Sequence, residues 1–326
     1  MPTTGSFYMK KWLTTILVAA VTALLLVYAL WNVDLAALGE VLTGADYRFV
    51  VPFLSTLTLF FSIKAWRWSV ILEPLGRYTI RQVTPALMIG FAANNVLPAH
   101  LGEIVRSMWF ARRYQQRTSA VLVSQVLERI LDVAAILLLY LLAVPWIESA
   151  PQAIRLSVWL VAAIAAVVCV LIYAMLAAPQ RVFQLWHVLG TKLPASIQSR
   201  GAAFLEDVLQ ALSSVQSPIR LLLLLANSLL QWSLMGVCVW LSMAAVGVFI
   251  GPAVTIIVLT ATVVAVTLPN APGYVGALQA AFVFALQPFG VSSEIAFAAS
   301  VFYLAGNWIP ITCVGALFML TTRSRA

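Results

Sequence analysis

Three charged residues, Glu128, Arg129 and Asp132, stand inside one long apolar stretch of this sequence. They follow Ser119, where that stretch begins, by nine to thirteen residues. In a helix that rises 1.5 Å per residue, this spacing places them roughly 13–20 Å from its start. If the stretch crosses a membrane, each ionised group facing lipid at that depth costs about 2.5–3.5 kcal/mol. We therefore expect the three side chains to face the protein interior or a polar cavity.

Two interpretations of these charges are open. Arg129 and Asp132 have the spacing of side chains that pair on one helix face, so they form either a buried ion pair that fixes helix packing or part of a functional cavity. Glu128 favours the cavity, because it is a second acid that needs its own cationic partner. Such a cavity would hold a lipid headgroup or its counter-charge.

A break interrupts a second hydrophobic stretch, residues 82–112. Its polar and helix-breaking residues are Asn94, Asn95, Pro98, Gly102, Glu103 and Arg106. The backbone groups that Pro98 and Gly102 free must bond to protein or to cavity water. A helix that starts near Gly102 would point its positive N-terminal end, which suits anions, at the tip of the break. Glu103 equally fits a first-turn acid that only stabilises the helix dipole.

A similar break without any charge interrupts the stretch 253–289. Its helix breakers and polar groups are Pro269, Asn270, Pro272, Gly273, Tyr274, Gly276 and Gln279. The glycines permit close backbone approach. Facing the first break across a pseudo-two-fold axis, this segment would complete a binding site at the membrane midplane.

Three arginines, Arg112, Arg113 and Arg117, follow the first broken segment. Clusters of this kind usually anchor the topology of a membrane protein. The alternative is recruitment of anionic headgroups, which basic residues at the inner surface attract.

The composition identifies the elements that carry these residues. Of the 326 residues, 63% are hydrophobic and 9% charged, and the mean hydropathy is +0.99. Soluble domains carry about 25% charged residues, so the chain is predicted to be an all-α polytopic membrane protein. The basic residues behind its formal net charge of +8 lie mostly in loops between apolar stretches. We therefore assign them to membrane topology and not to nucleic-acid binding. Nucleotide-binding, hydrolase and metal-site motifs are absent from the sequence, so we expect no enzyme activity, no cofactor and no metal.

Six apolar stretches are long enough to cross a bilayer. They cover residues 12–31, 47–66, 119–143, 153–177, 218–248 and 293–320. The two broken stretches are either re-entrant hairpins or pairs of full crossings. We favour hairpins, because halves of about 14–16 residues are short for a span.

Basic residues then lie mostly on one side of the membrane. With the N-terminus inside, fifteen basic residues, Lys64 and Arg67 among them, fall on the inner side and two, Arg48 and Arg155, on the outer side. This strong positive-inside bias predicts cytoplasmic N- and C-termini.

The two breaks share the pattern Leu-Pro-x-x-x-Gly, at Leu97–Gly102 and Leu268–Gly273, 171 residues apart. Each is preceded by two spans and followed by one, which indicates an inverted-topology repeat of residues 10–145 and 153–320 within a single transmembrane domain. Chance recurrence of so short a motif is the alternative. The polar connection 178–217 between the repeats is predicted to form an amphipathic helix on the inner surface.

The pattern resembles the lysylphosphatidylglycerol synthase transmembrane-region family, also called flippase-like domain proteins, from about residue 10 to 320. The residues that carry the resemblance are Arg67-Trp68, Gly90, Asn94, Asn95, Leu97-Pro98, Gly102-Glu103, Arg106, Glu128-Arg129, Asp132, Pro269, Pro272-Gly273 and Gly276. Two positions depart from the family pattern. Tyr303-Leu304 stands where the family often has Tyr-Arg, and Gln279 lies near the position of an acid that often follows the second break.

The resemblance implies a flippase of the bacterial or archaeal inner membrane, for anionic or aminoacylated phosphatidylglycerol-like lipids or isoprenoid lipids. Substrate-binding residues are expected at both breaks, in the charged span, and at Gln279 and Tyr303. The expected partners are membrane lipids, with a transferase and a second copy of the chain as further candidates. The alternative function is a non-transporting accessory subunit that presents lipid-linked substrate to a separate transferase.

Overall fold

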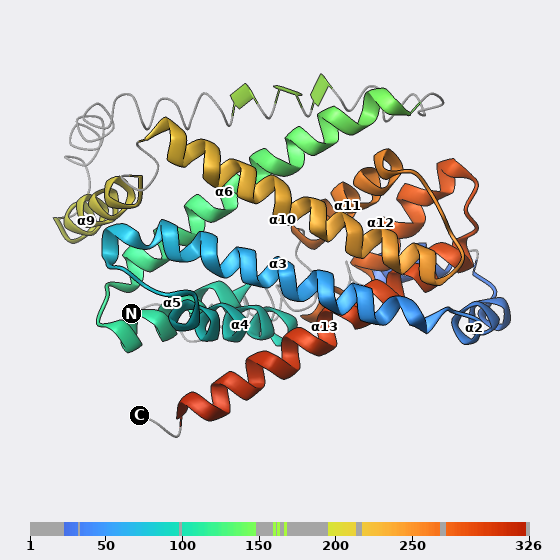
Figure 1. The fold of residues 1–326 in the computed structure, drawn as a ribbon, viewed down its shortest axis with the longest axis horizontal. Coiled ribbons are helices and arrows are strands. Elements are labelled where there is room, and N and C mark those ends of the chain that lie inside the picture. The colour runs from blue at the N-terminus through green and yellow to red at the C-terminus, as the bar shows by residue number, and fades with distance from the viewer. Residues whose placement is uncertain are drawn as a thin grey trace, which may run out of the picture.

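The computed structural model describes residues 23–31, 33–97, 100–147, 195–212, 217–267 and 272–323, together with six residues between 159 and 167. Within these ranges the regular elements are helices (Figure 1). After a helix at Ala23–Leu30, the α-helices are α2 (Leu35–Thr43), α3 (Val50–Ile71), α4 (Ile80–Val96), α5 (Leu101–Tyr114), α6 (Thr118–Ala143), α9 (Ala195–Leu212), α10 (Pro218–Ala245), α11 (Pro252–Thr267), α12 (Ala277–Leu286) and α13 (Ser293–Arg323). Among the short 3-10 turns, η1 (Tyr47–Phe49) leads into α3 and η5 (Pro272–Tyr274) lies within the second break.

Among the described residues, three helices are long and apolar enough to cross a membrane: Tyr47–Ile71, Pro218–Ala245 and Ser293–Thr322. A fourth span results if Ala23–Leu30 and Leu35–Thr43, which are bent by 83°, form one broken span. With 26 residues, α6 is also long enough, but it contains the charged residues Glu128, Arg129 and Asp132. The chain is therefore a membrane protein, and the regular elements of its described residues are all helices.

Four of the six predicted spans are helices in the structure, namely α3, α6, α10 and α13. The α3 helix ends at Ile71, five residues beyond the predicted end of that span at residue 66. Arg67 therefore lies inside the helix, as Lys64 does. The predicted spans 12–31 and 153–177 lie mostly outside the described residues.

Each broken stretch forms two short helices that pack against each other, α4 with α5 and α11 with α12. They have 17, 14, 16 and 10 residues, and at 1.5 Å per residue even the longest is about 26 Å, short of a hydrocarbon core of about 30 Å. The centres of the breaks, which contain Pro98, Pro269 and Asn270, lie outside the described residues.

Close glycine contacts hold α4 and α5 together. A Cβ atom on Gly102 would overlap the carbonyl oxygen of Gly90 and come within 2.6 Å of the Asn94 backbone nitrogen. No residue larger than glycine fits this crossing, so the close approach fixes where α5 carries its charged side chains.

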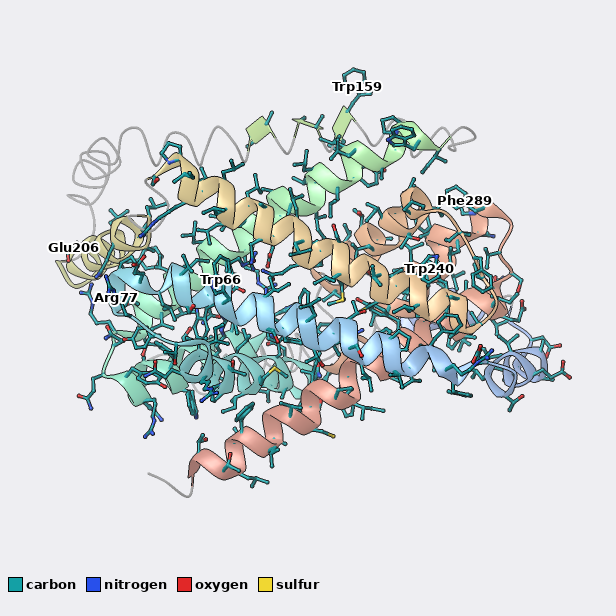
Figure 2. All side chains as sticks on the ribbon, viewed as in Figure 1. Trp66, Arg77, Trp159, Glu206, Trp240 and Phe289 are labelled. Carbon is teal, nitrogen blue, oxygen red and sulfur yellow. The ribbon has the colours of Figure 1, made fainter. Side chains whose placement is uncertain are left out.

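Helices α3 and α10 run antiparallel side by side through the middle of the molecule (Figure 1). The backbone nitrogen of Asp46, just before α3, donates to the carbonyl of Ala245 at the end of α10 over 2.7 Å. In Figure 2, Arg77 and Glu206 lie near one end of this pair and Phe289 near the other. Around it, α4 packs against α13, α11 packs against α6, and α6 also contacts α5 and α10.

The predicted helix in the polar connection is present as α9, and the rest of residues 178–216 lies outside the described residues. The helix packs against α6. Asp207, Ala211 and Leu212 are buried, whereas Phe204 is exposed. The buried face of α9 thus includes a carboxylate as well as apolar side chains.

Candidate functional site

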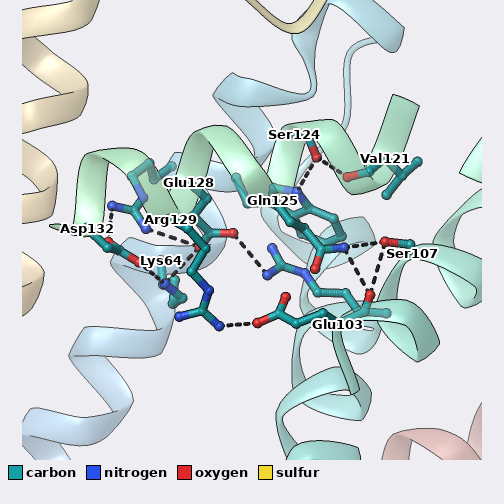
Figure 3. A network of polar contacts seen from close by, with 12 residues as sticks. Lys64, Glu103, Ser107, Val121, Ser124, Gln125, Glu128, Arg129 and Asp132 are labelled. Carbon is teal, nitrogen blue, oxygen red and sulfur yellow. Dashed lines mark hydrogen bonds and ion pairs between the residues drawn. The ribbon is translucent and has the colours of Figure 1, made fainter. Parts of the chain in front are cut away.

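The two acids of α6 face two basic residues of α3 in the protein interior (Figure 3). The Glu128 Oε1 atom lies 2.8 Å from Lys64 Nζ and 3.1 Å from Arg67 Nη2. Asp132 contacts the same two cations, at 3.3 Å from Lys64 Nζ and 2.7 Å from Arg67 Nη1. All four side chains are at most 4% exposed, so water screens these charges little.

A third cation, Arg106 of α5, reaches the same cluster. Its Nη1 atom lies 3.0 Å from Glu128 Oε2, and its guanidinium carbon lies 3.6 Å from the centroid of the Trp68 ring, a cation–π arrangement. Among the described residues, its Nε and Nη2 atoms have no hydrogen-bond partner although they are buried. Arg106 therefore has free donor capacity in a place without bulk water.

Arg129 pairs with Glu103 of α5 (Figure 3). The predicted pairing of Arg129 with Asp132 is wrong: Asp132 turns toward α3, where two cations contact it. Glu128 and Asp132, four residues apart, share one face of α6. Arg129 lies about 100° around the helix from Glu128, and its side chain is 48% exposed.

Lys64 and Arg67 were counted among the inner topology charges, and this assignment is also wrong. Arg67 is fully buried and Lys64 is 3% exposed, because each has acidic partners on α6. Arg67 also donates to Ser228 Oγ on α10. The cluster thereby joins α3, α5, α6 and α10 through charged groups.

Further polar contacts position α5 against α6. The Gln125 amide donates to Ser107 Oγ at 2.6 Å and to the Glu103 carbonyl at 3.3 Å. Trp68 Nε1 donates to Ser124 Oγ at 3.1 Å, which holds the ring that stacks on Arg106.

The asparagines of the first break take different positions. Asn95 donates from Nδ2 to the Trp308 carbonyl at 3.3 Å and to Thr312 Oγ1 at 2.9 Å, so it joins α4 to α13. Asn94 is buried beside Gly102, and its Oδ1 atom has no partner among the described residues. Asn94 therefore has a buried acceptor atom that no described residue uses.

The two breaks meet in space. The rings of His100 and Tyr274 lie 5.9 Å apart, and both residues have a positive φ, 55° and 60°, which is uncommon without glycine. A Cβ atom on Gly273 would lie 3.1 Å from Trp308 Nε1 on α13. Glu103 follows His100 by three residues at the start of α5 and pairs with Arg129, so the Glu103–Arg129 pair lies within a helical turn of the first break.

The remaining predicted binding residues of the second half have packing roles in the structure. Gln279 Oε1 accepts from the Gly276 backbone nitrogen at 2.7 Å, which caps α12. Tyr303 packs among aromatic rings, 6.2 Å from Phe53 and 5.6 Å from Phe282 between centroids. Neither side chain has a contact with the ion cluster.

The three arginines that follow the first break, Arg112, Arg113 and Arg117, are exposed. Arg112 and Arg113 lie in the last turn of α5, where cations stabilise the helix dipole. Arg117 pairs with the buried Asp207 of α9. Arg117 thus has a structural partner, and Arg112 and Arg113 remain candidates for headgroup recruitment.

Over residues 14–315 the sequence matches the family described as lysylphosphatidylglycerol synthase TM region. The chain belongs to this family. Comparison with curated proteins finds no match. Membership of the lysylphosphatidylglycerol synthase TM region family indicates a membrane lipid-related function, and the match covers every helix that contributes to the ion cluster.

Proposed function

We propose that this protein is a lipid flippase that moves phospholipid between the leaflets of the inner membrane. Its substrate would be an anionic or aminoacylated phosphatidylglycerol-like lipid, or an isoprenoid lipid. The observation that carries the proposal is a buried ion cluster in which Arg106 keeps two unpaired donor atoms. A half-exposed ion pair, Glu103–Arg129, lies beside it.

The depth of the cluster suits a translocation site. Glu128 and Asp132 follow the start of α6 by ten and fourteen residues, or about 15–21 Å along the helix. A charge at the bilayer centre is costly unless it is paired or lines a polar path, and such charges mark ion and substrate pathways. Arginine donors match phosphate oxygens in geometry and charge.

The arrangement of helices supports an inverted repeat. Each half has the order of one long helix, two short helices and another long helix. Each half also packs the first of its short helices on the last long helix of the other half, α4 on α13 and α11 on α6. In transporters with such repeats, substrate binds between them near the midplane.

The proposed orientation has both termini in the cytoplasm. Without the buried Lys64 and Arg67, thirteen basic residues remain on the expected inner side against two on the outer side. The positive-inside bias therefore survives the correction.

The test is leaflet exchange of labelled phosphatidylglycerol, lysyl-phosphatidylglycerol and phosphatidylcholine in proteoliposomes. We expect headgroup-selective exchange that Arg129→Ala abolishes. The matched control is Arg48→Ala, which removes an arginine that is 91% exposed and pairs with Asp46 outside the ion cluster. Equal exchange by the wild type and Arg129→Ala would contradict the proposed role of the site. No exchange above empty liposomes would favour the accessory subunit that serves a transferase.

A further inference from the structure

The ion cluster carries one surplus positive charge. Its cations are Lys64, Arg67, Arg106 and Arg129, and its acids are Glu103, Glu128 and Asp132. Four cations against three acids leave a net charge of +1 among the described residues. The half-exposed pair Glu103–Arg129 is neutral in itself, so the surplus belongs to the buried part.

Within the buried part, the surplus falls on Arg106. All four carboxylate oxygens of Glu128 and Asp132 already contact a cation, and Lys64 and Arg67 each contact both acids. Arg106 contacts only Glu128, through Nη1. Among the described residues, its Nε and Nη2 atoms have no hydrogen-bond partner. Arg67 Nε also lacks one, but both Nη atoms of Arg67 already contact the acids.

These two free atoms form a fork. In a planar guanidinium group, the Nε–H bond and one Nη2–H bond point in the same direction and match two oxygens of a phosphate. The face of the group is covered by the Trp68 ring at 3.6 Å, so the fork edge is the part left for a ligand.

The Glu103–Arg129 pair is the most exposed part of the cluster. Glu103 lies one turn before Arg106 on α5, and Arg129 follows Glu128 on α6. With side chains 20% and 48% exposed, these two residues form the exposed edge of the cluster. Arg106 itself is 3% exposed, so an anion that enters at this edge reaches Arg129 before Arg106.

We infer that the site selects a lipid headgroup with a single negative charge, a phosphodiester monoanion, which the fork of Arg106 binds. This inference rests on the proposed function and names its substrate class. One bound monoanion brings the cluster to zero net charge, the state that costs least to bury. A neutral lipid leaves +1, a dianionic phosphate monoester leaves −1, and a cationic aminoacylated lipid raises the charge to +2.

The experiment is calorimetric binding of short-chain lipids to the purified full chain at pH 8. The probes are dioctanoyl phosphatidylglycerol, phosphatidylcholine, lysyl-phosphatidylglycerol and phosphatidic acid, which is close to dianionic at this pH because its second pKa is about 6. We expect phosphatidylglycerol to bind at least about tenfold more tightly than the other three. Dimethyl phosphate, a soluble monoanionic diester, separates a lipid site from a free-phosphate site.

Two variants shift the charge of the cluster in opposite directions. Glu103→Gln raises it to +2 and is expected to move the preference to phosphatidic acid. Arg129→Gln lowers it to zero and is expected to remove the preference for phosphatidylglycerol over phosphatidylcholine. Arg48→Ala is the control that leaves the order of affinities unchanged. If Glu103 served folding alone, Glu103→Gln would still prefer phosphatidylglycerol to phosphatidic acid.

Preference of the wild type for lysyl-phosphatidylglycerol or phosphatidylcholine would overturn the inference, and so would an unchanged order of affinities in Glu103→Gln. Binding of dimethyl phosphate as tight as that of phosphatidylglycerol would show a free-phosphate site and overturn the lipid assignment. Monoanion selectivity without leaflet exchange would uphold this inference and refute the flippase. Leaflet exchange of the cationic lysyl-phosphatidylglycerol would support the flippase and refute this inference.

Discussion

Replacing Glu128 by glutamine removes the carboxylate that three buried cations share. Its two oxygens contact Lys64 and Arg67 on one side and Arg106 on the other. The variant raises the charge of the buried part from +1 to +2. Removing one partner of a buried ion pair costs about 3–5 kcal/mol, because the remaining charge stays uncompensated. We expect the free energy of unfolding to fall by this amount. The equilibrium constant for unfolding then rises more than about a hundredfold.

The assay is equilibrium unfolding in mixed detergent micelles with increasing SDS. The control is Asp46→Asn, whose exposed pair with Arg48 contributes little to stability. Adding Lys64→Met to Glu128→Gln returns the buried charge to +1, so the double variant is expected to recover stability through a coupling of about 0.5–3 kcal/mol. A loss in Glu128→Gln as small as in the control, or strict additivity with Lys64→Met, would refute the shared-carboxylate reasoning.

Gly102→Ala is expected to destabilise the protein by about 1–3 kcal/mol through overpacking against α4. Gly39→Ala, at an exposed position of α2 where a Cβ atom meets nothing within 4 Å, is expected to keep or slightly raise stability in the same unfolding assay. Asn95→Ala loses two hydrogen bonds to α13. It is expected to cost about 1–3 kcal/mol with an unchanged affinity for phosphatidylglycerol, and a loss of affinity alone would contradict its packing role. Arg117→Ala leaves the buried Asp207 without its cation. Limited proteolysis is expected to cleave α9 faster in this variant, and unchanged cleavage would show that the pair does not hold α9.

Apolar length predicts the long helices of the fold well. The predicted spans 119–143 and 293–320 match α6 and α13 within a few residues, since about 20 apolar residues in a row have few alternatives to a helix. Pro and Gly likewise mark both breaks. Apolar length predicts the end of α3 five residues too early, because a charged residue such as Arg67 usually marks the interface at which a span ends.

The partners within the site are harder to predict from sequence. Local spacing suggested that Arg129 and Asp132 pair, but the cations that pair with Asp132 lie more than sixty residues earlier in the chain. Contacts of this kind depend on how helices cross, which no local pattern records. The usable signal was the imbalance around Glu128, an intramembrane acid without a local partner, together with the Arg67-Trp68 pair.

The central claim is that the fork of Arg106 binds a lipid phosphate inside the membrane. A cryo-EM structure in nanodiscs of phosphatidylglycerol, with a bound antibody fragment to aid alignment, tests it most directly. We predict phosphate density about 3 Å from Arg106 Nε and Nη2, with Glu103 displaced from Arg129. Lipid density confined to the outer surface of the helices, with the fork of Arg106 bonded to protein or water, would contradict the claim.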